Sequence, residues 1–228
     1  MTEALPRVSV CIPTHRRPDY LRQAIASVRA GSEQNFEIVI SDDAGELESR
    51  RVADSFQDAR IRYLPFNGDG IAANWSNALK QARAPYAFKL DDDDEIEPAF
   101  LTRCCDFLDA HPAAAVVFTG FTYLHPDKAP RAQIDSVYWN GCDAVAGLDY
   151  ARDILLNRAY PLNHKSAGVF RKAAAERAKF FDVVTVDVIF SAALAASGEV
   201  GYIPEALFRY HVRDAKHEGM EQRPLRML

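Results

Sequence analysis

Four consecutive aspartates occupy positions 91 to 94, directly after the short apolar run of residues 86–90. An apolar run that ends in carboxylates is typical of a buried strand that brings acidic side chains to the edge of a sheet. Carboxylates about 4 Å apart repel one another by roughly 1 kcal/mol in water and about 4 kcal/mol at an effective dielectric of 20. The run therefore indicates either a solvated acidic turn or a site where a hard cation, Mg²⁺ or Mn²⁺, offsets the charge.

Polar residues also follow the first two apolar runs of the chain. The run at 8–12 leads into Thr14 and His15, and the run at 36–40 leads into Asp42 and Asp43. In parallel α/β sheets, ligands bind beyond the carboxyl ends of the strands. Three polar strand ends on that side favour a binding site over a simple acidic turn.

The elements that must position these residues alternate between strand and helix. Short β-branched or apolar runs predict strands at 8–12, 36–40, 61–64, 86–90 and 115–118, and helical spacing predicts helices at 18–30, 44–56, 72–83 and 99–111. Later helices are expected near 149–157, 172–179 and 185–196, with strands near 169 and 200–203. Residues 122–146 are poorly patterned and predict a long loop with short strands. This alternation predicts an α/β fold with a mostly parallel central sheet flanked by helices.

Composition sets further bounds. The 228 residues are 48% hydrophobic and 26% charged, which suits one soluble domain, and a net charge of −5 argues against a dedicated nucleic-acid-binding protein. No apolar stretch reaches the roughly 18 residues of a membrane span, and no apolar signal-peptide core is expected. The four cysteines lack Cys-x-x-Cys spacing, so we expect reduced thiols in a cytoplasmic protein and no zinc site.

Several segments together are similar to the family 2 glycosyltransferases of the GT-A fold. The first three are residues 8–14 (VSVCIPT), 36–43 (FEIVISDD) and 86–94 (YAFKLDDDD), the last followed by Pro98. The later segments 184–187 (VTVD) and 203–211 (IPEALFRYH) resemble that family's final motifs. The resemblance covers about residues 7–213. It implies a Rossmann-like sheet in one domain over 1–213, a nucleotide-sugar-binding half at 7–121, a variable acceptor and catalytic half at 122–213, and a C-terminal tail at 214–228.

The resemblance also implies an activity and a donor site. The activity is transfer of a sugar from a nucleotide diphosphate sugar, a UDP-sugar being favoured, with inversion at the anomeric carbon. The residues expected at the donor are Pro13, Thr14, His15, Asp43, Asp91 and Asp92. Counting back from Pro98, Asp93 is the expected direct ligand of Mn²⁺ or Mg²⁺, with Asp91 and His211 as further metal ligands. Side chains alternate along an extended segment, so Asp91 and Asp93 are expected to share a face while Asp92 points away.

The acceptor side is expected to carry the catalytic base. By resemblance that base is Asp187, although many relatives have a second acid where this chain has Val186. An apolar neighbourhood would raise the pKa of Asp187, whereas the structural alternative is a first-turn aspartate that interacts with a helix dipole. Trp139 is expected either to stack on an acceptor sugar or to pack internally, and His164 either to contact the acceptor or to lie in an ordinary loop.

The function expected from these motifs is synthesis of bacterial surface polysaccharide or lipopolysaccharide. The acceptor would be a saccharide or a lipid-linked saccharide, and the enzyme would work in the cytoplasm or at the inner face of the membrane, although no basic amphipathic helix supports peripheral association. One alternative is a sugar-phosphate nucleotidyltransferase, but the glycine-rich signature of that class is missing after Ile12. The other is a non-catalytic nucleotide-sugar-binding domain.

Overall fold

The computed structural model of the protein describes residues 5–68, 70–156, 168–178 and 187–212. The strands are β1 (Val8–Thr14), β2 (Phe36–Asp42), β3 (Ile61–Pro65), β4 (Tyr86–Lys89), β5 (Glu95–Ile96), β6 (Ala114–His125), β7 (Lys128–Gln133), β8 (Ala144–Val145), β9 (Gly168–Arg171) and β10 (Glu199–His211). The helices are α1 (Pro18–Arg29), α2 (Leu47–Ser55), α3 (Ile71–Lys80), α4 (Phe100–Ala110), α5 (Ser136–Trp139), α6 (Gly147–Leu155), α7 (Lys172–Arg177) and α8 (Asp187–Ala195).

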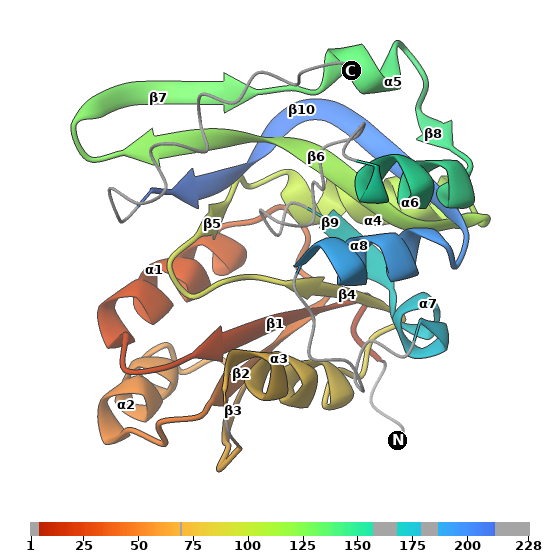
Figure 1. The fold of residues 1–228 in the computed structure, drawn as a ribbon. Coiled ribbons are helices and arrows are strands. Elements are labelled where there is room, and N and C mark those ends of the chain that lie inside the picture. Colours follow the sequence, from red (N-terminus) through yellow and green to blue (C-terminus); the bar gives the residue numbers. More distant parts are fainter. Residues whose placement is uncertain (1–4, 69, 157–167, 179–186, 213–228) are drawn as a thin grey trace.

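One mixed sheet organises the fold, and its strand order is β3-β2-β1-β4-β9-β6-β10-β5. The pairs β1–β2, β2–β3, β1–β4 and β6–β10 are parallel, whereas β9 runs antiparallel to both β4 and β6. Helices α3 and α8 lie in front of the sheet in Figure 1 and α4 lies behind it. The predicted α/β fold, with a mostly parallel sheet flanked by helices, is therefore confirmed.

Strand β1 shows where β4 separates from its neighbour at the polar end of the sheet. All seven residues of β1 are buried, which explains their apolar and β-branched character. Leu90 N–H donates to Cys11 O on the β4 side, and Asp43 N–H donates to Thr14 O on the β2 side. Because successive strand residues face alternate neighbours, Pro13 faces β4, beyond the last β1–β4 pair at Cys11 and Lys89. Pro13 has no N–H to donate, but the chain after β4 turns away at this point and offers no strand partner. The sheet therefore loses no hydrogen bond at Pro13.

The poorly patterned region contains more strand than the sequence predicted. Strand β6 extends to His125 and forms a hairpin with β7, and β10 continues to His211. These strands were expected to end at residues 118 and 203. The longer strands correct that expectation. The two-residue period of β6 is hidden by its polar and small residues, and that of β10 by irregular pairing between Ile203 and Phe208.

An aromatic cluster joins β4 and α4, which flank the acidic run, to β10. Phe88 in β4 lies 4.7 Å from Phe100 in α4, measured between ring centroids, and both rings lie 6.3 Å from Phe208 in β10. All three side chains are fully buried. This cluster fixes β4 and the start of α4 against β10, so the turn between β4 and α4 is held from both sides.

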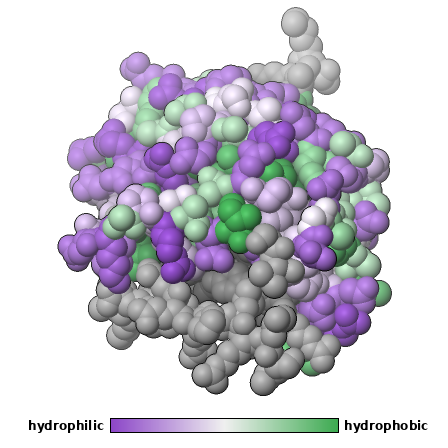
Figure 2. Space-filling view, turned by 90° about the horizontal axis from the view of Figure 1, so that it is seen from above, coloured by the Kyte–Doolittle hydropathy of each residue, from purple (hydrophilic) through white to green (hydrophobic). Residues whose placement is uncertain are grey.

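Seen from above, hydrophilic side chains cover much of the described surface, with apolar residues scattered among them (Figure 2). Within the described ranges, no helix is both long enough and apolar enough to cross a membrane. The four cysteines are free thiols, and Cys142 alone among them is exposed.

Candidate active site

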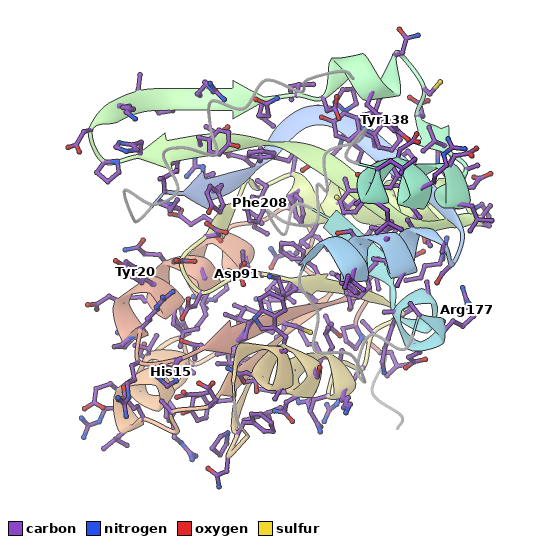
Figure 3. The ribbon with its side chains drawn as sticks, viewed as in Figure 1. His15, Tyr20, Asp91, Tyr138, Arg177 and Phe208 are labelled. Carbon is purple, nitrogen blue, oxygen red and sulfur yellow. The ribbon has the colours of Figure 1, made fainter. Side chains whose placement is uncertain are left out.

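The polar ends of β1, β2 and β4 meet at one edge of the sheet, as expected. Thr14 pairs in register with Asp42 of β2. Its hydroxyl donates to Asp92 Oδ2 at 2.7 Å, which ties the end of β1 to the acidic run. In Figure 3, Asp91 and His15 lie on the side toward which β1 points, and Tyr138 lies well away from them beside α5. Parallel strands therefore bring together residues that are more than seventy positions apart.

The four aspartates form a turn in which buried and exposed carboxylates alternate. Asp94 N–H donates to Asp91 O at 3.1 Å, which closes the turn. The side chains of Asp91 and Asp93 are 30% and 23% exposed, whereas Asp92 is 7% exposed and Asp94 is buried. Asp91 and Asp93 are therefore the more exposed carboxylates of the run, but they lie in a turn and not in the extended segment that the sequence predicted.

Every carboxylate of the run has a partner in the protein, and Asp92 and Asp93 share one. Lys89 Nζ lies 3.0 Å from both oxygens of Asp91. Arg17 Nη1 lies 3.3 Å from Asp92 Oδ1 and 3.3 Å from Asp93 Oδ2. Asp94 Oδ1 accepts the backbone N–H of His211 at 2.9 Å, so Asp94 fixes the end of β10 to the turn.

Negative charge remains in excess at this turn despite these partners. Burial raises the pKa of Asp92 to about 6, although the Thr14 hydroxyl and Arg17 oppose the rise. Burial and the nearby charges of Asp91 and Asp93 raise the pKa of Asp94 well above its usual value. A local cation would favour the ionised forms of these groups, so the chemistry of the site suits a hard divalent ion.

The residues present fit such an ion in kind, since the exposed carboxylates of Asp91 and Asp93 are hard oxygen donors. Lys89 and Arg17 hold these oxygens in this structure. Across the described part of the chain, no three His, Cys, Asp or Glu side chains converge on one point as a ready metal site. His211 lies beside the run, but its Nε2 is 2.8 Å from Glu95 Oε1. Occupation by a metal would therefore require these side chains to rearrange.

The two aspartates after β2 have different surroundings. Asp42 is fully buried and accepts the N–H groups of residues 44, 45 and 46 together with the hydroxyl of Tyr63. The same contact, together with burial, raises the pKa of Tyr63 above its usual range. The Asp43 side chain is 12% exposed, and its Oδ1 is 2.6 Å from Nδ1 of the exposed His15. Asp42 therefore builds the turn, whereas Asp43 contacts a side chain at the surface.

Helix α3 adds two polar side chains that the sequence could not place. Asn74 Nδ2 donates to Thr14 O at 3.1 Å, and the indole of Trp75 lies under Lys89 with Nζ 3.5 Å from the ring centroid. Asn74 Oδ1 and Trp75 Nε1 are buried without a hydrogen-bond partner among the described residues. Lys89 stands out in the sequence as a charge within a buried strand, which was a usable signal. Arg17 carried no comparable signal.

On the acceptor side, Trp139 takes the second of its two expected roles, internal packing. Trp139 is only 2% exposed, and its ring stacks on Tyr202 at 5.0 Å with an interplanar angle of 10°. Because Tyr202 covers that ring face, Trp139 packs internally and does not present the face to a sugar. His164 lies outside the described residues. Asp187 begins α8, and its side chain also lies outside what the structure describes.

Comparison with known proteins adds the family. The family model described as Glycosyl transferase family 2 matches residues 9–177. The putative teichuronic acid biosynthesis glycosyltransferase TuaG of Bacillus subtilis is 31% identical over 134 residues, covering 57% of this chain and 52% of that protein. A Campylobacter jejuni protein named GalNAc(5)-diNAcBac-PP-undecaprenol beta-1,3-glucosyltransferase is 34% identical over 96 residues, covering 40% of this chain and 31% of that protein.

Solved structures support the same fold. The crystal structure of residues 1–349 of S. aureus TarS in complex with UDP-GlcNAc aligns with a TM-score of 0.73 and 17% identity, covering 96% of this chain and 61% of that one. The curated relatives are longer than the region they share with this protein. The chain spans between 15% and 62% of the length of several that it matches.

Proposed function

The chain belongs to glycosyl transferase family 2, and from that membership we propose that it transfers a sugar from a nucleotide diphosphate sugar to a hydroxyl acceptor with inversion of the anomeric carbon. The convergence of Thr14, Asp43 and the aspartate turn at one sheet edge is the observation that carries this proposal. UDP is the favoured nucleotide, because TarS, which shares the fold, has been solved with UDP-GlcNAc and with UDP.

In this proposal, the open edge of β1 and β2 receives the nucleoside. Pro13, Thr14 and His15 border it, and Asp43, whose carboxylate contacts the exposed His15, binds the base. Asp91 reaches the ribose, since its side chain is more exposed than that of Asp92. Asp92 is proposed to act at the donor site through Thr14, whose hydroxyl donates to it.

Asp93 and Asp91, with His211 nearby, would hold Mn²⁺ or Mg²⁺. Such an ion supplies Lewis-acid stabilisation of the charge that builds on the leaving diphosphate. The protein's own contribution is to concentrate carboxylate oxygens at the strand end and to orient them through Thr14 and Asp94. The raised pKa values of Asp92 and Asp94 support a site built for added positive charge.

Asp187 is proposed as the general base that removes the acceptor proton. It opens α8, whose remaining residues pack near β6 and α6. His164 is proposed as an acceptor contact. The acceptor is proposed to be a saccharide or lipid-linked saccharide of a bacterial surface polymer, at the cytoplasmic face of the membrane. The support is that TuaG and the Campylobacter jejuni relative are named for glycan synthesis of this kind.

Turnover of a panel of UDP-sugars with Mn²⁺ tests this function, with release of UDP and the anomeric configuration of the product as readouts. We expect inverted product from the wild type. We expect a loss of about 100-fold or more in kcat for Asp187→Asn, with UDP affinity unchanged. Release of pyrophosphate from a nucleoside triphosphate and a sugar phosphate would instead establish a nucleotidyltransferase. Tight UDP binding without turnover of any donor would indicate a binding domain.

A further inference from the structure

Arg17 holds two adjacent carboxylates of the aspartate turn with one nitrogen. Its Nη1 lies 3.3 Å from Asp92 Oδ1 and 3.3 Å from Asp93 Oδ2. The Arg17 side chain is 51% exposed, whereas the two carboxylates are 7% and 23% exposed. The guanidinium therefore covers the turn from the solvent side.

The backbone of Arg17 is fixed although its side chain is exposed. Arg17 is the residue before α1, its carbonyl accepts the N–H of Leu21 at 3.0 Å, and Pro18 begins the helix. Arg16 before it has φ +56°, which makes the sharp bend from β1 into the helix. The long, half-exposed side chain of Arg17 therefore extends from a fixed backbone position at the edge of the site.

The other cation of the turn is held differently. Lys89 is 7% exposed, its Nζ lies 3.5 Å from the centre of the Trp75 ring, and it contacts both oxygens of Asp91. Moving Lys89 away from these partners would leave a buried charge unpaired. Moving Arg17 away from the turn would break only long contacts of a half-exposed side chain. Lys89 is therefore the more firmly held counter-ion of the turn, and Arg17 is the one that is more easily displaced.

We propose that Arg17 is an exchangeable counter-ion that occupies Asp92 and Asp93 until a divalent cation and a nucleoside diphosphate bind, and that its guanidinium then moves onto the diphosphate. This rests on the proposed donor function. A divalent cation on Asp93 would repel a guanidinium that stayed on the same carboxylate, because both are positive. The guanidinium fork matches phosphate oxygens and remains charged throughout. The exchange keeps the carboxylates neutralised before binding and the phosphates neutralised after it.

Titration calorimetry on Arg17→Gln, with Mn²⁺ alone and then with UDP in saturating Mn²⁺, tests the exchange. Loss of a competing, half-exposed ion pair predicts that Mn²⁺ alone binds roughly 3- to 10-fold more tightly than to the wild type. Loss of the phosphate contact predicts that UDP binds about 10-fold more weakly, while uridine affinity is unchanged. A variant that merely damaged the fold would weaken both ligands, so the opposite signs are the distinguishing result.

Arg22→Gln is the matched control, because Arg22 lies on the same helix, carries the same charge and contacts the Ser55 hydroxyl instead of the turn. We expect wild-type affinity for both ligands in that variant. Mn²⁺ affinity that is equal in wild type and Arg17→Gln, or UDP affinity that is equal in the two, overturns the exchange while leaving the donor function intact. A wild type that binds neither Mn²⁺ nor UDP overturns the proposed function and the exchange with it.

Discussion

At the scale of single residues, Asp42 and Asp43 show how adjacent identical side chains divide their work. Asp42 satisfies three backbone N–H groups and one hydroxyl from a fully buried position, and Asp43 contacts the exposed His15. The first is required by the fold, and the second is the one that we propose for donor binding.

The two aspartates therefore predict opposite effects of the same substitution. Asp42→Ala leaves buried donors unpaired and should lower the free energy of unfolding by about 2–4 kcal/mol. Asp43→Ala should change stability by less than about 1 kcal/mol but weaken UDP binding by about 10-fold or more. Urea unfolding and calorimetry on both variants measure this. A destabilised Asp43→Ala with normal UDP affinity would reverse the division.

Among the single residues, Asp92 is expected to make the free energy of unfolding depend on pH. Its folded pKa of about 6 lies above the ordinary value of 3.8. Its contribution to stability is therefore complete below about pH 4 and is lost as the pH rises through 6. In metal-free protein, Asp92→Asn should raise the free energy of unfolding by about 1–3 kcal/mol at pH 7.5 and have little effect at pH 4. Urea unfolding at the two pH values checks this. An equal effect at both would contradict the assigned pKa.

At the scale of elements, β4, α4 and β10 meet in the aromatic cluster of Phe88, Phe100 and Phe208. This cluster supports the turn from one side. On the other side, Asp94 accepts the backbone N–H of His211 at the end of β10. The carboxylates thus project from a rigid base rather than from a free loop.

Phe208→Ala should lower the free energy of unfolding by about 3–5 kcal/mol, because it removes a fully buried ring from this cluster. It should also weaken Mn²⁺ binding, since the β10 side of the turn loosens. Leu148→Ala is the control, because Leu148 is 72% exposed and should cost no more than about 0.5 kcal/mol. Similar unfolding energies for the two variants would show that the cluster does not support the turn.

The elements also show what local sequence can predict. Uniform apolar runs such as β1 and β2 reveal a strand buried on both faces, and the polar residues that follow them revealed the site. For Asp91 to Asp94 the sequence predicted an extended segment, whereas the structure has a turn closed by the Asp94 N–H and Asp91 O. The contacts of Arg17 with Asp92 and Asp93 were not predicted, since they depend on where α1 begins relative to β4. The stacking of Trp139 on Tyr202 depends in the same way on distant residues.

At the scale of the whole molecule, the sheet gathers donor-side residues at the ends of β1, β2 and β4, and β10 returns to the same edge. In Figure 1, the β6–β7 hairpin and β10 lie above the β1–β4 part of the sheet. Family membership and the TarS fold agree with this arrangement. The central claim is that this edge binds a nucleoside diphosphate together with a divalent cation.

Calorimetric titration of UDP into the wild-type protein, with Mn²⁺ and then with excess EDTA, tests that claim most directly. We predict binding in Mn²⁺ that weakens by at least about 10-fold in EDTA, and the same weakening in Mn²⁺ when Asp93 is replaced by Asn. UDP binding of equal strength in Mn²⁺, in EDTA and in Asp93→Asn would contradict a metal–diphosphate site at the aspartate turn.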